Sequence, residues 1–153
     1  MIAGVVLKDL TVHKDERGAL FEILRSDYPE FKAFGQTYIT VCKPGWVKGW
    51  HYHLKQQDYF CVLRGKAKIV LFDRREGSAT KSEINEFELS AEKPQALVIP
   101  VGIVHGFECL SEHEAWIMNV PNQLYNYKQP DEFRITLDSK EVPYKPWQVK
   151  KGW

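Results

Sequence analysis

The chain has 153 residues, of which 44% are hydrophobic and 27% charged, with a formal net charge of +1. This length suits one hydrophobic core, and the small net charge gives no electrostatic reason to expect nucleic acid or a membrane surface as a partner. No apolar run approaches the roughly 20 residues of a membrane-spanning helix, and the N-terminus lacks the basic leader of a signal peptide. We therefore expect a soluble protein with a single domain over residues 1–153.

The cysteines indicate the compartment. Cys42, Cys61 and Cys109 are an odd number and contain no CxxC pair. This usage favours reduced thiols over a disulfide framework, and it indicates a cytoplasmic protein. We expect each thiol to pack in or beside a core strand as a small hydrophobic side chain.

Short apolar runs rich in Val, Ile, Phe and Tyr recur along the chain, and turn residues separate them. In chain order these predicted strands are residues 3–13, 19–24, 37–42, 59–65, 66–73, 85–90, 95–100, 114–120 and 133–138. In residues 66–73, alternation places Ala67, Ile69 and Leu71 on one face, with Val70 and Phe72 on the other. Only residues 27–34 and 123–132 have room for a short helical turn. The pattern predicts an all-β jelly-roll barrel with little helix.

A histidine motif lies in the segment GWHYHLKQQDYFCVLRG, residues 49–65. His51 and His53 are two positions apart, so on a strand both rings project from the same face. Their spacing to Asp58, and the later segment PVGIVH with His105, resemble the two signatures of the cupin superfamily. His51, His53, Asp58 and His105 together are a suitable ligand set for a divalent transition metal such as Fe, Mn, Ni or Zn.

A longer resemblance covers most of the chain, from residue 15 to about residue 138. Five ordered segments are similar to the dTDP-4-dehydrorhamnose 3,5-epimerase family, a branch of the cupins. They are DERGALFEI, VKGWHYH, VLRGKAKIVLFDRREGSAT, ELSAEKPQALVIPVGIVHGFECLSE and EFRITLD. Several segments in order are more specific than a single motif.

The resemblance implies a nucleotide-diphospho-4-keto-6-deoxy sugar as substrate, no metal or redox cofactor, and a homodimer that exchanges N-terminal strands. His51 matches the family's base, and Asp138 matches the carboxylate that orients the base. His105 matches the polar group near the keto oxygen.

The same resemblance implies further substrate contacts. Arg17 and Glu22 would face the nucleotide and diphosphate in a neighbouring subunit. Lys48 stands where the family has an arginine that contacts the diphosphate. Lysine supplies the charge for this contact but not the bidentate geometry of arginine.

Three positions depart from the family pattern. His53 replaces a glutamine, Asp58 replaces a lysine that polarises the keto oxygen, and Met118 replaces the tyrosine that returns the proton. A thioether has no proton to donate. Tyr125 and Tyr127, in the following segment, and His53 itself are the candidates to replace that donor.

Three functions therefore stand at this point. The first is an epimerase or isomerase of nucleotide sugars in deoxysugar or surface-polysaccharide biosynthesis, and the ordered segments favour it. The second is a metal-binding cupin, either a metalloenzyme or a small-molecule binding module, with His51, His53, Asp58 and His105 as ligands. The third is a catalytically inactive relative that only binds sugar.

Overall fold

A computed structural model describes residues 1–145 and residue 147, so Pro146 and residues 148–153 of the predicted domain lie outside the described residues. The described chain forms twelve strands, and within it no helix is long and apolar enough to cross a membrane. The strands are β1 (Val6–Asp9), β2 (Val12–Asp15), β3 (Gly18–Phe21), β4 (Tyr38–Cys42), β5 (Val47–Tyr52), β6 (Asp58–Arg64), β7 (Lys66–Asp73), β8 (Ile84–Ser90), β9 (Gln95–Ile99), β10 (Ile103–Cys109), β11 (Ala115–Asn119) and β12 (Phe133–Arg134).

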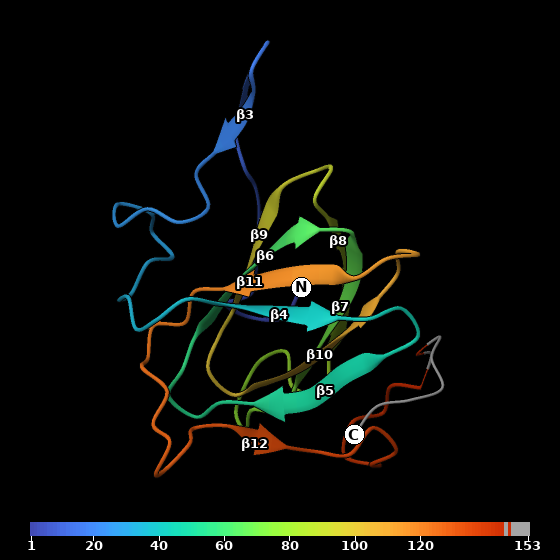
Figure 1. The fold of residues 1–153 in the computed structure, drawn as a ribbon. Helices are drawn as coiled ribbons and strands as arrows, with labels where there is room; N and C mark the ends of the chain where they lie inside the picture. The colour runs from blue at the N-terminus through green and yellow to red at the C-terminus, as the bar shows by residue number, and fades with distance from the viewer. Residues whose placement is uncertain (146, 148–153) are drawn as a thin grey trace.

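Two five-stranded antiparallel sheets face each other and make up the barrel (Figure 1). One sheet has the strand order β1-β9-β6-β11-β4, and the other has the order β12-β5-β10-β7-β8. Consecutive strands often lie in different sheets, as in a jelly roll. The predicted all-β jelly-roll fold is confirmed.

The main core lies between the two sheets and includes side chains from β6, β7, β9, β10 and β11. Ala67, Ile69 and Leu71 belong to this core, whereas Val70 and Phe72 pack in a second cluster on the outer face of their sheet. The predicted faces of residues 66–73 are therefore correct. The cysteines are unpaired and buried, as expected: Cys42, Cys61 and Cys109.

The segments that had room for helical turns form no helix: residues 27–34 contain isolated turns, and residues 123–132 contain only bends. The amide of Tyr28 donates to the carbonyl of Arg25 over 3.2 Å, and the amide of Phe31 donates to the carbonyl of Tyr28 over 3.0 Å. Pro29 interrupts this series because proline has no amide hydrogen to donate.

Two glycines let β5 and β10 approach each other closely. A Cβ atom on Gly49 would lie 2.7 Å from the Cα of Gly106, closer than real carbon contacts. His51 and His105 are register partners directly beside this contact, and the register shifts between His105 and Phe107. The close approach therefore places the two histidines side by side.

The β2–β3 hairpin stands apart from the barrel. Among the described strands, β2 and β3 pair only with each other, as a separate two-stranded sheet, and the hairpin projects away from the two large sheets (Figure 1). Leu20 on β3 is 61% exposed. A projecting arm with an exposed apolar side chain is available for contact with another molecule.

Candidate functional site

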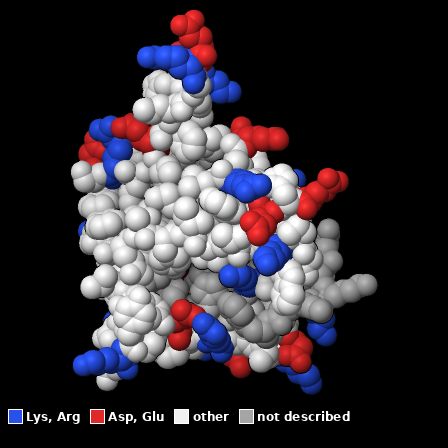
Figure 2. Space-filling view, in the orientation of Figure 1, with Lys and Arg blue, Asp and Glu red and all other residues white. Residues whose placement is uncertain are grey.

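A cavity of about 640 Å³ lies between the two sheets. Figure 2 shows the surface hollowed between β4 and β5, with charged side chains along the edge of the hollow. This volume is within the range of sites for small molecules and cofactors. The lining residues come from both sheets, from the segments just before β4 and just after β5, and from residues 121–132: Gln36, Thr37, Tyr38, Thr40, Lys48, His51, His53, Gln56, Phe60, Phe107, Ile117, Asn119, Tyr125, Tyr127, Glu132 and Arg134.

Three histidines gather at one side of this cavity. The ring centroids of His51 and His105 are 4.0 Å apart, and those of His53 lie 5.7 Å from His51 and 5.6 Å from His105. One nitrogen from each ring lies within 4.8 Å of the other two. The structure therefore brings together the three histidines that the two sequence signatures selected.

Asp58 lies behind the histidines and is 1% exposed. Its Oδ2 atom is 3.5 Å from Nε2 of His53 and 3.4 Å from Nε2 of His105. Its Oδ1 atom accepts hydrogen bonds from Nε2 of Gln56 at 2.6 Å and from Nδ2 of Asn119 at 2.8 Å. Asp58 does not line the cavity itself, so its influence on a bound molecule passes through these side chains.

The backbone sets the orientation of two of the rings. Nδ1 of His105 is 3.0 Å from the carbonyl oxygen of Ile103, and Nδ1 of His53 faces the carbonyl oxygen of Asp131. A carbonyl accepts only, so each Nδ1 carries the hydrogen. In the neutral rings each Nε2 then directs a lone pair toward the Asp58 carboxylate. A proton or a metal cation between Nε2 and this carboxylate would stabilise the contact.

Burial makes two of these histidines weakly basic. The pKa of His51 is lowered well below its ordinary value of 6.5, mainly by burial and then by the neighbouring rings of His105 and His53. Burial also lowers the pKa of His105 to about 4, although the Asp58 carboxylate acts in the opposite direction. Both rings are therefore neutral at neutral pH and can accept a proton.

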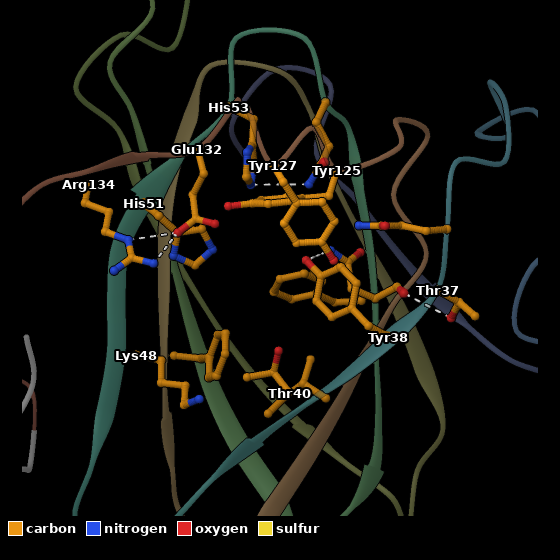
Figure 3. Close-up of a pocket in the computed structure, with 16 residues that line it drawn as sticks. Thr37, Tyr38, Thr40, Lys48, His51, His53, Tyr125, Tyr127, Glu132 and Arg134 are labelled. Atoms are coloured by element: carbon orange, nitrogen blue, oxygen red, sulfur yellow. Dashed lines mark hydrogen bonds and ion pairs between the residues drawn. The ribbon is translucent and has the colours of Figure 1, made fainter. Parts of the chain in front are cut away.

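Charged side chains beside His51 include two that the sequence analysis missed. Arg134 on β12 is the register partner of His51, and its Nε donates to Oε1 of Glu132 over 2.8 Å. Figure 3 shows the Glu132 carboxylate next to the His51 ring, with Lys48 further along the same side. Alternation in the segment DEFRI puts Glu132 and Arg134 on one face, but only the pairing of β12 with β5 directs that face to His51.

Three tyrosines lie on the other side of the cavity. Tyr125 and Tyr127, both predicted substrate contacts, come from the segment after β11, and their ring centroids are 4.9 Å apart. Tyr38 comes from β4 and was missed by the sequence analysis. Met118 packs against the cluster on the outer face of its sheet, so the cavity-facing neighbours on β11 are Ile117 and Asn119.

Five predicted site residues do not line the cavity: His105 and Asp58 are buried behind its histidine side, and the other three, Asp138, Arg17 and Glu22, lie elsewhere. Asp138 is exposed, and the predicted contact with His51 is not formed, because the chain turns away after Ile135 and Ser139 hydrogen-bonds back to Thr136. Among the described residues, the buried Nδ1 of His51 has no hydrogen-bond partner.

The remaining two predicted residues belong to the projecting arm and its continuation. Arg17 is exposed and pairs with Asp15 at 2.7 Å, whereas Glu22 pairs with Arg25 at 2.7 Å. Neither Arg17 nor Glu22 lines the cavity of its own chain. Their expected contact with a substrate in a neighbouring subunit stays a prediction.

Comparison with known proteins identifies relatives of this chain. Residues 13–133 match the family model described as polysaccharide biosynthesis C-terminal domain. The spore coat polysaccharide biosynthesis protein SpsL of Bacillus subtilis is 38% identical, over 94% of this chain and 95% of that protein. The probable low-salt glycan biosynthesis epimerase Agl13 of Haloferax volcanii is 36% identical, over 90% and 89% of the two chains. A dTDP-4-dehydrorhamnose 3,5-epimerase of Pseudomonas aeruginosa is 31% identical, over 76% and 68%.

Solved structures have the same fold. A dTDP sugar isomerase of Desulfovibrio desulfuricans superposes with a TM-score of 0.88 and 28% identity, over 94% of this chain and 91% of that one. The dTDP-6-deoxy-D-glucose-3,5-epimerase of Legionella pneumophila, solved in complex with dTDP-4-keto-L-rhamnose, superposes with a TM-score of 0.84 and 25% identity, over 97% and 80%. The chain therefore belongs to the dTDP-4-dehydrorhamnose 3,5-epimerase family, whose members are enzymes of the cupin fold.

Proposed function

We propose that this protein epimerises a nucleotide-diphospho-4-keto-6-deoxy sugar, at C3, C5 or both, in deoxysugar or surface-polysaccharide biosynthesis. The observation that carries the proposal is the position and protonation state of His51. Its ring lines the cavity, and its pKa is lowered, so the ring is neutral and ready to accept a proton. Two relatives, SpsL and Agl13, are named for spore coat polysaccharide and glycan biosynthesis, which supports the same class of pathway.

The chemistry follows from the acidity of protons next to a carbonyl group. His51 removes the proton from the carbon beside the 4-keto group, and an enolate forms as negative charge moves to the keto oxygen. The imidazolium of His51 and other donors at the cavity stabilise this charge. Return of a proton to the opposite face of the same carbon completes the inversion. We propose that no cofactor takes part.

Cationic side chains at the cavity suit the diphosphate of the substrate. Lys48 and Arg134 both line the cavity on the side of His51 (Figure 3). Phosphate oxygens bind ammonium and guanidinium groups through charge-assisted hydrogen bonds. Lys48 therefore keeps its predicted role, and Arg134 joins it.

The projecting arm supports a homodimer. The β2–β3 hairpin pairs with no other described strand, and it presents Arg17 and the exposed Leu20 to the outside. In a dimer that exchanges this arm, Arg17 and Glu22 reach the partner's cavity, which gives both residues their predicted role at the nucleotide. We also propose that the chain acts as one domain in the cytoplasm, where the three unpaired thiols remain reduced.

The test is solvent exchange into a dTDP-4-keto-6-deoxy sugar in deuterated water, followed by proton NMR. The wild-type protein should replace the C3 or C5 proton with deuterium and form the epimer. His51→Ala should reduce exchange by about a hundredfold or more. The exposed His113 lies in a turn away from the cavity, so His113→Ala is a matched control with wild-type exchange. Unchanged exchange in His51→Ala would remove the assignment of His51 as the base.

A divalent transition metal at the histidines is the second candidate. The observation that favours it is the convergence of His51, His53 and His105, two of which direct Nε2 toward Asp58. Backbone carbonyls hold the Nδ1 atoms of His53 and His105, as is usual for histidines that bind metals. His51, His53 and His105 would hold the ion, with Asp58 beside two of them, and the ion would supply Lewis-acid chemistry for a bound carbonyl.

A further inference from the structure

The hydroxyl of Tyr38 lies across the cavity from His51. Tyr38 belongs to β4 of one sheet and His51 to β5 of the facing sheet. Figure 3 shows the two side chains on opposite sides of the cavity, with open space between them. A flat sugar enolate in this space would therefore have the imidazole on one side and the Tyr38 phenol on the other.

A buried side chain fixes the position of the Tyr38 hydroxyl. Nδ2 of Asn119 donates to Oη of Tyr38 at 2.9 Å and to Oδ1 of Asp58 at 2.8 Å. The Asn119 amide is itself oriented, because its Oδ1 accepts a hydrogen bond from the backbone amide of Tyr59 at 3.0 Å. Asn119 is 2% exposed, so water does not compete for these contacts.

This network leaves the Tyr38 hydrogen available. An amide NH₂ group only donates, so the Tyr38 oxygen is the acceptor in its contact with Asn119. Within the described part of the chain, this is the one hydrogen bond of the Tyr38 hydroxyl. The hydroxyl hydrogen is therefore free to point into the cavity, where the substrate would lie.

We infer that Tyr38 is the acid that returns a proton to the sugar, on the face opposite to His51. This inference rests on the proposed epimerase function. In each turnover His51 takes the proton from the carbon beside the keto group and becomes an imidazolium, while the C–H electron pair moves into the enolate. The Tyr38 O–H bond then breaks, its proton forms the new C–H bond, and the phenolate keeps the electron pair. Solvent carries the proton from His51 back to Tyr38 before the next turnover.

The surroundings of Tyr38 suit this role. Although 41% of Tyr38 is exposed, partial burial raises its pKa to about 12, and the phenol is protonated at neutral pH before the reaction. After the reaction, the hydrogen bond from Asn119 stabilises the phenolate oxygen. Met118, which stands at the position of the family's tyrosine, faces away from the cavity. Tyr38 is the register partner of the next residue, Asn119, and its side chain lines the cavity.

The two other phenols at the cavity are held less firmly. Tyr127 is 89% exposed. Neither Tyr125 nor Tyr127 has a hydroxyl hydrogen bond to the described residues, and both belong to a segment without strand structure. A proton donor has to be held at the reacting carbon to be effective, and among the three only Tyr38 is anchored in this way.

The test separates removal of the proton from its return. In deuterated water, Tyr38→Phe should form the epimer about a hundredfold more slowly or worse. The same variant should still incorporate deuterium with retention of configuration, within about threefold of the total wild-type exchange rate, because His51 gives the deuteron back on its own face. Tyr28→Phe, outside the cavity, is the matched control and should form the epimer at the wild-type rate.

The outcomes are distinguishable. Epimer formation at the wild-type rate in Tyr38→Phe would overturn the inference and leave the epimerase function intact. Retention-only exchange in Tyr125→Phe or Tyr127→Phe instead of Tyr38→Phe would assign the acid to that residue. Loss of both exchange and dTDP binding in Tyr38→Phe, with an unchanged urea unfolding midpoint, would make Tyr38 a binding residue. A wild-type protein without any exchange would overturn the proposed function itself.

Discussion

Oδ2 of Asp58 lies 3.4 Å from Nε2 of His105, and the other oxygen of the same carboxylate accepts a hydrogen bond from Asn119. Through these contacts one buried carboxylate joins the histidines on one side of the cavity to Tyr38 on the other. The family's pattern has a lysine at this position, so Asp58 carries the opposite charge to the one that the resemblance implies. In the structure, the Asp58 carboxylate contacts side chains from both sides of the cavity and anchors both.

Asp58→Asn should preserve the shape of the anchor and remove its charge. The oxygen of the new amide can still accept from Gln56 and Asn119, and its NH₂ group can donate to Nε2 of His53 and His105, so the substitution removes mainly the negative charge that favours a protonated imidazole. We expect kcat to fall about tenfold or more while KM changes by less than about threefold. The share of exchange that occurs without inversion should stay unchanged, because Asn119 keeps its hydrogen bond to Tyr38. A raised KM with unchanged kcat would contradict this role, and the exposed Asp9→Asn is the control.

Lys48→Ala should weaken substrate binding more than chemistry. Removing one cation from the cavity should raise KM for the dTDP-sugar about tenfold, with a smaller change in kcat, if Lys48 contacts the diphosphate. The loss should shrink as salt concentration increases, because salt screens the charge that was removed. Lys43 is exposed outside the cavity, so Lys43→Ala should behave like the wild type in the same steady-state assay.

Chelation distinguishes the two candidate functions. If His51 acts as a base without a cofactor, protein dialysed against a chelator should keep its epimerase rate within about twofold. Elemental analysis of the same sample should then find much less than one metal ion per chain. If the rate is lost on chelation and restored by a divalent transition metal, the histidines and Asp58 act as a metal site instead.

Asp73→Asn should destabilise the fold in a way that depends on pH. Asp73 is fully buried and accepts hydrogen bonds from Arg75 at 2.8 Å, Ser78 at 2.7 Å and Thr80 at 2.7 Å. The contact with Arg75 holds the pKa of Asp73 well below its ordinary value of 3.8. A lowered pKa in the folded state stabilises the protein above the unfolded pKa, and this stabilisation is lost as the pH falls below about 4.

Urea unfolding measures this effect. At neutral pH, Asp73→Asn should lower the free energy of unfolding by about 2 kcal/mol or more. The difference in stability between wild type and variant should be smaller at about pH 3 than at neutral pH, and it should shrink further as the pH falls toward the lowered pKa of Asp73 in the folded protein. A difference that is the same at both pH values would show that the Asp73 charge is not responsible. Asp27→Asn, which removes a carboxylate from an exposed ion pair with Arg25, should have a much smaller effect.

Gly49→Ala should disturb both the fold and the site. The added methyl group would meet the backbone of Gly106 at 2.7 Å, and backbone cannot rotate away as a side chain can. We expect a loss of about 2 kcal/mol in the free energy of unfolding. Because β5 and β10 would separate beside His51 and His105, the epimerase rate should fall as well, even at temperatures where the variant is fully folded.

The sequence determined the features that depend on short spacings. Alternation along residues 66–73 assigned each side chain to its face, because successive residues of a strand point in opposite directions. The same rule placed His51 and His53 together at the cavity. The ordered segments identified the family, and a family fixes the fold that those segments adopt.

Tertiary structure alone decided which distant side chains meet. Asp58 and Asn119 are 61 positions apart, and Tyr38 and Asn119 are 81 apart, yet hydrogen bonds join them. Such contacts depend on strand order, register and bulges, which no local pattern encodes. For the same reason the sequence assigned Asp138 to His51, although the chain turns away first, and it overlooked Tyr38, which reaches the site from the facing sheet.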